Sequence, residues 1–303
     1  MARPSGGAAG LLALLALAGC GGAQEPPRPA DDAGLTAPTA PAAAPGGPAA
    51  AQPAPDPLTI TLALPDGDEQ AFPHELAAAL KAGAKRIVIP PGVHRVLGLP
   101  PAAGREPWAA VVENASDIEI DGRGATLLLT DRRRAGINFV SCARITLRGL
   151  RVQRATPAFS QGMIEAVDAA ANTVDVRVAA GYPQDIDDPR FFTHVWMNVF
   201  APTPPAGQTR RWLTHLRSAT PPVMQKLAAD LWRIKVEPLK TSGVPITAGQ
   251  PVAWRGEVFS DIRLSRCADM RLVGVTVAQG AGFCFHEMGG DGGNRYELSL
   301  IHI

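Results

Sequence analysis

The sequence predicts an all-β protein, a right-handed parallel β-helix that begins with a short capping helix and is interrupted by a small antiparallel β-barrel or sandwich. Three observations support this prediction. An eight-residue motif with alternating apolar positions recurs, its first two copies lie 27 residues apart (Ile118 to Ile145), and a stretch with a different strand pattern precedes the third copy. Aromatic residues make up only 5% of the chain, so the core must consist mainly of Val, Ile and Leu.

The first 20 residues are typical of an export signal. Arg3 precedes an apolar run that is too short to span a bilayer, which takes roughly 20 residues. The run ends in Leu17-Ala-Gly-Cys20, which resembles the bacterial lipobox, and this resemblance implies that Cys20 is the lipid-attachment residue. We therefore expect an exported protein of the bacterial cell envelope, anchored to the membrane through Cys20. The alternative is an ordinary signal peptide cleaved elsewhere, with Cys20 incidental.

Residues 21–57 form a linker rich in Pro and Ala without apolar periodicity, which we expect to remain extended. The formal net charge of +1 gives no electrostatic reason to expect a nucleic-acid partner. Besides Cys20, the chain has Cys142, Cys267 and Cys284, none of them in a metal-binding spacing. We expect buried thiols, no metal and no cofactor.

Folded sequence begins at Leu58, where residues 58–64 alternate as a strand does. Residues 72–83 predict a short helix, with apolar residues spaced by four, Pro73 in the first turn and Gly83 at the end. Residues 86–96 read as a strand, a Pro-Pro-Gly turn and a second strand. This opening resembles that of pectin-lyase-like β-helix proteins, and the resemblance implies that the helix covers the open end of the solenoid.

The repeated motif occurs at residues 115–122, 142–149 and 267–274, and each copy ends in Gly. Its aligned apolar positions are Ile118, Ile145 and Met270, followed by Ile120, Leu147 and Leu272. We expect these side chains to stack inward along the helix axis and the glycines to permit the bends between strands.

Residues 155–257 separate rungs at 58–154 from resumed rungs at 258–303, and they contain many short strand patterns. Segments 163–168 and 173–178 predict a hairpin with a four-residue loop. Further strands are expected around residues 193–200, 212–216, 232–236 and 251–255.

A β-helix interrupted in this way resembles family-110 glycoside hydrolases, which are exo-acting α-1,3-galactosidases. The resemblance is carried by residues 162–168, 173–178 with 181–183, and 267–294.

This resemblance implies a glycan substrate and a pair of carboxylates across the scissile bond. Within residues 283–296, Glu287 and Asp291 are the candidate catalytic residues, and His286 and Asn294 are the candidate substrate-binding residues. We expect Phe283 and Phe285 to point inward, and Cys284 and His286 outward. The alternative is that the Gly-Gly-Asp-Gly-Gly segment is only a turn and Glu287 only a charge at the rim.

Residues 298–303 break the rung pattern, so we expect a chain truncated near residue 297, with the main catalytic carboxylates beyond it. Such a fragment should be inactive and poorly soluble.

Three functions remain open. A glycoside hydrolase requires further paired carboxylates, whereas a non-catalytic glycan-binding or adhesion protein requires exposed aromatic side chains without converging carboxylates. A polysaccharide lyase requires a basic catalytic residue beside calcium-binding acids.

Overall fold

The computed structural model describes residues 58–98, 100, 107–188, 196–202, 211–218, 223–239, 243–256, 260–280, 282–297 and 299–302. The export signal, Cys20 and the linker lie outside these residues. Helix α1 (Ala71–Lys81) is shorter than a bilayer-spanning segment, and no other helix in the described ranges has the length and hydropathy to cross a membrane.

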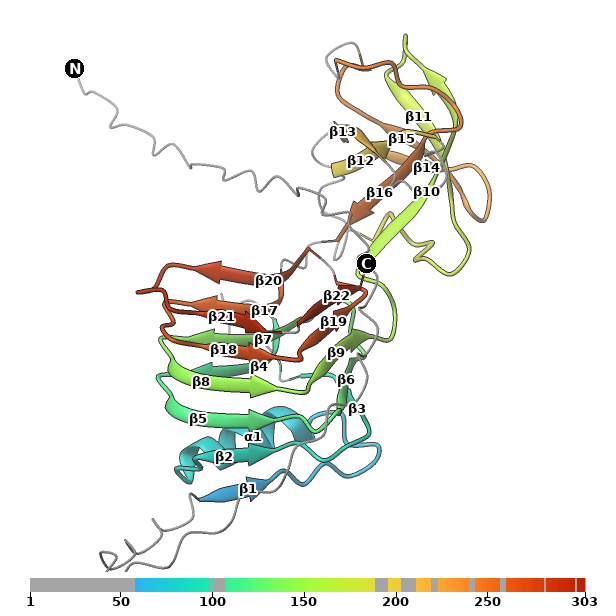
Figure 1. Ribbon diagram of the computed structural model, residues 1–303. Helices are drawn as coiled ribbons and strands as arrows, with labels where there is room; N and C mark the ends of the chain where they lie inside the picture. The colour runs from blue at the N-terminus through green and yellow to red at the C-terminus, as the bar shows by residue number, and fades with distance from the viewer. Residues whose placement is uncertain are drawn as a thin grey trace, which may run out of the picture. The chain divides into compact units, whose positions relative to one another are not determined.

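Three parallel sheets form a β-helix, as the sequence predicts (Figure 1). The first sheet contains β1 (Thr59–Thr61), β2 (Arg86–Val88), β5 (Ser116–Asp121), β8 (Ala143–Arg148), β18 (Arg271–Val273) and β21 (Arg295–Glu297). The second contains β3 (Val93–Val96), β6 (Thr126–Leu129), β9 (Arg151–Arg154), β19 (Thr276–Ala278) and β22 (Leu300–His302). Strand β22 pairs in parallel with β19, so residues 300–302 continue the rung pattern that the sequence was expected to break there. The third contains β4 (Trp108–Glu113), β7 (Ala135–Val140), β17 (Ser260–Ser265) and β20 (Phe283–Met288).

The strand register confirms the repeat alignment. Ile120 of β5 pairs with Leu147 of β8, which pairs with Leu272 of β18 across the whole intervening insertion. All three side chains are buried in one core. The first sheet bends after each motif, and Gly149 and Gly274 adopt φ angles of 56° and 61° there, in the left-handed region that favours glycine.

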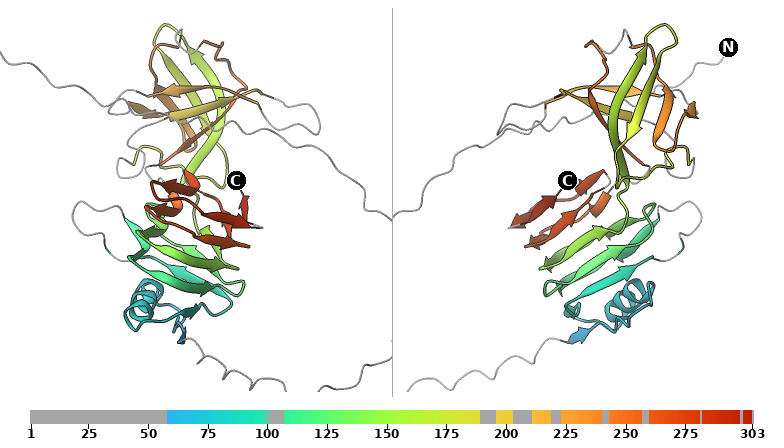
Figure 2. Two further views of the ribbon diagram at one scale, coloured as in Figure 1. Left: turned by 60° about the vertical axis from the view of Figure 1, so that its left-hand side comes forward. Right: turned by 90° about the vertical axis from the view of Figure 1, so that its right-hand side faces the viewer.

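Helix α1 begins and ends close to the predicted positions. Phe72, Leu76 and Ala79 lie on its buried face and join the core of the β-helix, so the helix covers apolar side chains of the first rungs. Gly83 follows the helix with a φ of 79°. Two rotated views show the helix at the β1 end of the stacked strands (Figure 2).

Between β9 and β17 the chain forms a seven-stranded antiparallel sheet in the order β13-β12-β16-β10-β11-β15-β14. Its strands are β10 (Phe159–Asp168), β11 (Thr173–Val178), β12 (Trp196–Phe200), β13 (Trp212–Arg217), β14 (Met224–Lys226), β15 (Leu231–Lys235) and β16 (Pro251–Arg255). The pairing of β10 with β11 confirms the predicted hairpin. One face of this inserted sheet packs on a core that includes Ile164, Val176, Trp232 and Trp254.

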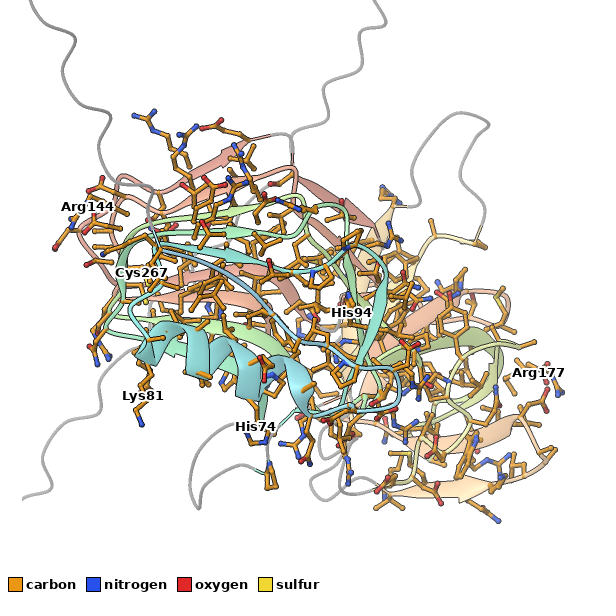
Figure 3. All side chains as sticks on the ribbon, turned by 90° about the horizontal axis from the view of Figure 1, so that it is seen from below. His74, Lys81, His94, Arg144, Arg177 and Cys267 are labelled. Atoms are coloured by element: carbon orange, nitrogen blue, oxygen red, sulfur yellow. The ribbon has the colours of Figure 1, made fainter. Side chains whose placement is uncertain are left out.

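Charged side chains cover the outside of the first sheet. Arg144 projects from the outer edge of the β-helix (Figure 3), and its Nε lies 2.6 Å from Asp117 Oδ1. The hydrogen bond from Arg144 lowers the pKa of Asp117 to about 2. About half of each side chain is exposed, so this pair makes little difference to stability.

Candidate functional site

The predicted catalytic residue Glu287 occupies an inward-facing column of the third sheet. Its strand register aligns Glu287 with Leu264 and, one rung further, with Phe139, both of which are buried in the core. Tyr296 is aligned with the buried Leu272 in the same way. Glu287 and Tyr296 therefore continue two core columns onto the β20–β21 rung, rather than projecting from the outer face of the solenoid.

Glu287 accepts two hydrogen bonds in this position. Asn294 Nδ2 donates to Glu287 Oε1 at 2.6 Å, and the Tyr296 hydroxyl donates to Oε2 at 3.3 Å. Burial, together with the neighbouring negative charge of Glu287, raises the pKa of Tyr296 to about 12. The same Asn294 accepts a hydrogen bond from the backbone N–H of Met270 at 2.9 Å through its Oδ1. The amide of Asn294 thus links two rungs and orients the carboxylate.

His286 contacts different neighbours. Its Nδ1 lies 2.9 Å from the hydroxyl oxygen of Ser260, and its ring lies 4.6 Å from that of Phe283. Phe285 packs against the core as predicted. Phe283 lies on the same face of β20 as Phe285, as predicted, but is 53% exposed, and Cys284, predicted to point outward, is buried. Cys284 is covered because it lies beside the buried Asp261, and burial and the Asp261 charge raise its pKa to about 11.

Asp291 is exposed in the glycine-rich turn after β20. The backbone of this turn requires its glycines. A Cβ at Gly290 would lie 2.3 Å from the carbonyl oxygen of Cys267, and one at Gly293 would lie 2.2 Å from Asp269 Oδ1. Both residues also have positive φ angles. The turn is therefore packed closely on the preceding rung, which accounts for its composition without a catalytic role.

The exposed face of the inserted sheet carries a second candidate site. Its strand register aligns His215, Asn198, Ala253 and Gln161 in one row across β13, β12, β16 and β10. Larger side chains lie on either side of this polar row. Trp196 and Phe159 are on one side, and Trp212, Phe200 and Met163 are on the other.

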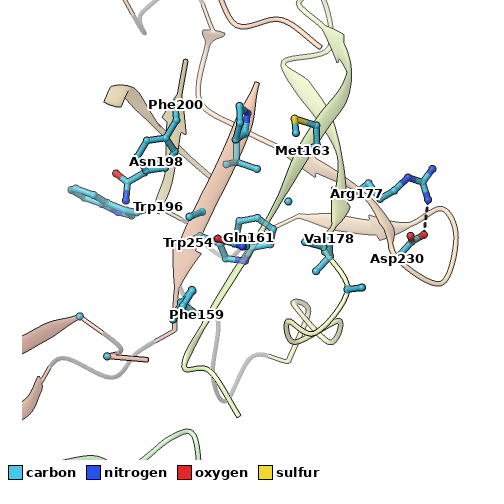
Figure 4. Close-up of a pocket in the computed structure, with 18 of the residues that line it drawn as sticks. Phe159, Gln161, Met163, Arg177, Val178, Trp196, Asn198, Phe200, Asp230 and Trp254 are labelled. Atoms are coloured by element: carbon cyan, nitrogen blue, oxygen red, sulfur yellow. Dashed lines mark hydrogen bonds and ion pairs between the residues drawn. The ribbon is translucent and has the colours of Figure 1, made fainter. Parts of the chain in front are cut away.

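Most of these side chains line a groove of about 900 Å³ (Figure 4), and His215 and Trp212 lie beside it on β13. Its lining includes Phe159, Gln161, Met163, Trp196, Asn198, Phe200 and Ala253, and its far end carries Arg177 and Asp230. The small side chain of Ala253 leaves the centre of the sheet open between the aromatic rings. At the far end, Arg177 Nη1 lies 2.7 Å from Asp230 Oδ1.

Strand β13 extends this surface at the edge of the sheet. The rings of Trp196 and His215 are nearly parallel, 8° apart, with centroids separated by 5.2 Å. The indole N–H of Trp212 donates to Asn198 Oδ1 at 3.3 Å, and Arg217 places its guanidinium 4.3 Å from the centre of the Trp196 ring. Trp196 and Trp212 nevertheless remain 48% and 53% exposed.

The sequence pattern predicts residues 193–200 and 212–216 only as strands, and it does not predict a site at any of the groove residues. The available signal was the alternation Trp196-x-Asn198-x-Phe200, which places a tryptophan, an amide and a phenylalanine on one face of a strand. Elsewhere in the described residues, no cluster of three or more His, Cys, Asp or Glu side chains is arranged to hold a metal ion.

Comparisons with known proteins add little to this description. No family model matches the chain, and no curated protein sequence matches it. Among solved structures, one match is the Gp54 tailspike of Acinetobacter baumannii bacteriophage AP22 in complex with A. baumannii capsular saccharide. The two chains are 10% identical with a TM-score of 0.21, over 74% of this chain and 32% of the tailspike. This chain thus spans about a third of the tailspike, and the β-helix assignment depends on its own strand pairing.

Proposed function

We propose that this protein binds a polysaccharide in the groove of its inserted sheet and presents that sheet from a lipid-anchored β-helix of the cell envelope. The observation that supports the proposal is the row of Asn198 and Gln161 between exposed aromatic rings. Among the functions left open by the sequence, a non-catalytic glycan-binding protein was the one expected to expose aromatic side chains without converging carboxylates.

Sugar rings combine an apolar C–H face with hydroxyl groups around their edge. The half-exposed side chains of Trp196 and Trp212 provide large, rigid apolar surfaces that can contact the C–H face of a sugar. The amides of Asn198 and Gln161 provide donors and acceptors for the hydroxyl groups. A mostly apolar groove with a few convergent polar groups is the general form of a small-ligand site.

A protein partner fits this surface less well. The centre of a protein–protein interface is its most apolar part, with polar groups at the rim. Here the arrangement is reversed, because the polar row of His215, Asn198 and Gln161 lies between the aromatic side chains.

Affinity electrophoresis of the full-length chain through gels containing soluble polysaccharides tests this proposal. We expect retardation by at least one polysaccharide, and a loss of about tenfold or more in affinity for Trp196→Ala and Trp212→Ala, equivalent to about 1.4 kcal/mol or more. Val93→Ala is the control, because Val93 is an exposed apolar side chain on β3 of the β-helix and is not among the residues that line the groove. Equal retardation of all four proteins would contradict the proposal.

Glycoside hydrolysis of the α-galactosidase type is a second candidate, favoured by the orientation of Glu287 through Asn294 and Tyr296. In this reaction Glu287 and Asp291 would be the catalytic pair, one as the acid and the other as the base or nucleophile. His286 and Asn294 would contact the substrate. The test is release of galactose from α-1,3-galactosides, with Glu287→Gln and Asp291→Asn as variants. Turnover that survives both substitutions would exclude these residues as the catalytic pair.

The proposed lipid anchor is tested separately. Cells expressing the chain and given a radiolabelled fatty acid should label it at Cys20, and the protein should sediment with membranes. Cys20→Ala should abolish both the label and the sedimentation. A protein that is labelled or sediments equally well without Cys20 would rule out this anchor.

A further inference from the structure

We infer that the polysaccharide bound by the groove is anionic and carries carboxylate groups, as uronic-acid polymers do. This inference depends on the proposed function, and its evidence is the distribution of charge around the groove. The guanidinium of Arg217 and the imidazole of His215 lie at the β13 edge, and Arg177 lies at the far end. Asp230 is the one carboxylate among the described residues that line the groove.

That carboxylate is already paired. Arg177 contacts Asp230 on one side and Glu165 on the other, so these three side chains at the far end of the groove carry a net negative charge. The paired carboxylates also raise the pKa of Arg177. This end of the groove therefore offers little attraction for a charged sugar.

Arg217 differs from Arg177 in this respect. In the part of the chain that the structure describes, no carboxylate forms an ion pair with Arg217, and its neighbour is the face of the Trp196 ring. A guanidinium stacked on an indole keeps its in-plane N–H donors available, because stacking uses the face of the cation and not its edge. The indole also reduces the conformational freedom that Arg217 would lose on binding.

The geometry of a guanidinium favours a carboxylate. Its planar pair of N–H donors matches the two oxygens of a planar carboxylate in a bidentate contact. The Trp196 ring, the Arg217 guanidinium and the Asn198 amide lie on neighbouring residues of paired strands. One sugar ring in the groove can thus contact the indole while its carboxylate reaches Arg217. The formal charge of the whole chain is only +1, so general attraction of polyanions is weak and a preference must come from this site.

Affinity electrophoresis of the full-length chain tests the inference with three polysaccharides: polygalacturonate, a sulfated galactan and a neutral galactan. We expect the wild type to bind polygalacturonate most tightly. Arg217→Gln should weaken that binding about tenfold and leave binding to the neutral galactan unchanged. Arg144→Gln is the matched control for removing one exposed arginine, because Arg144 pairs with Asp117 on the β-helix. It should bind as the wild type does.

The outcomes separate this inference from the proposed function. If Trp212→Ala weakens binding to every polysaccharide while Arg217→Gln leaves the preference for polygalacturonate unchanged, the groove binds glycans but Arg217 does not select acidic ones. Equal or tighter binding of the sulfated galactan would overturn the assignment to carboxylates. A wild-type protein that binds none of the three would overturn both proposals.

Discussion

Arg154 and Asp261 form a buried ion pair that joins the last strand before the insertion to the first strand after it. Arg154 Nη2 lies 2.5 Å from Asp261 Oδ1, both side chains are 1% exposed, and 107 positions separate them in sequence. Arg154 Nη1 also donates to the carbonyl oxygen of Arg134 at 2.6 Å. A buried ion pair therefore links the two strands that flank the insertion.

Removing one member of this pair should be costly. We expect Asp261→Ala to lower the free energy of unfolding by about 3–5 kcal/mol, because it leaves the buried charge of Arg154 without its partner. Urea denaturation followed by circular dichroism measures the change. Asp117→Asn is the control, since it neutralises one member of the exposed pair with Arg144, keeps a residue that tolerates the φ of 59° at this position, and should leave the midpoint nearly unchanged. Equal effects of the two substitutions would show that the Arg154–Asp261 pair is not buried in solution.

The β-helix could be predicted because its information is local and repeated. Each motif alternates apolar residues and ends in glycine, so aligning Ile120 with Leu147 and Leu272 gives the register directly, even across a long insertion. Helix α1 could be predicted for the same reason, since its periodicity lies within a few turns.

The groove could not be predicted in this way. It is formed by β13, β12, β16 and β10, which are neighbours in the sheet but not in the sequence. The row that joins Asn198 to Ala253 and Gln161 exists only once that strand order is known. The neighbours of Glu287 could not be predicted either. Alternation within β20 gives the face on which Glu287 lies, but it does not show which residues of other rungs it contacts.

Removing one inward-facing side chain tests whether the aligned residues of successive rungs are stacked in the core. Leu272→Ala should destabilise the protein by about 2–5 kcal/mol, because Leu272 is fully buried and its removal leaves a cavity between Tyr296 and the buried Leu147. Thr146→Ala alters the neighbouring position of the same sheet, which is not buried in the core, and should change stability by about 0.5 kcal/mol or less. Urea midpoints of both variants provide the comparison. Similar losses at the two positions would contradict the assigned register.

The three described cysteines should be unreactive in the folded protein. Burial raises the pKa of Cys142, and burial together with Asp261 raises that of Cys284 to about 11, so little thiolate exists at pH 8. In a Cys20→Ala background, we expect Ellman's reagent to label none of Cys142, Cys267 and Cys284 within minutes at pH 8. Labelling of all three should follow denaturation in guanidinium. Rapid labelling of Cys284 in the native protein would show that the β20 region opens readily.

Tyr296 should report its contact with Glu287 through its ionisation. Since the chain has only two tyrosines, Tyr182→Phe leaves Tyr296 as the single phenol whose absorbance at 295 nm can be titrated. Its pKa of about 12 lies above the ordinary value of 10, so the fold favours the protonated phenol. The corresponding stabilisation is fully present below pH 10 and is lost as the pH rises from 10 towards 12.

Glu287→Gln removes the negative charge and the carboxylate acceptor but keeps the burial of the phenol. We therefore expect the pKa of Tyr296 to fall towards 10 without reaching it, and the loss of stability above pH 10 to become smaller. Asp291→Asn is the control, because it neutralises a nearby exposed carboxylate in the following turn and should leave the titration unchanged. Circular dichroism at each pH verifies that the protein remains folded. If Glu287→Gln and Asp291→Asn give the same curve as the parent, Tyr296 does not contact Glu287, and the carboxylate is oriented by Asn294 alone.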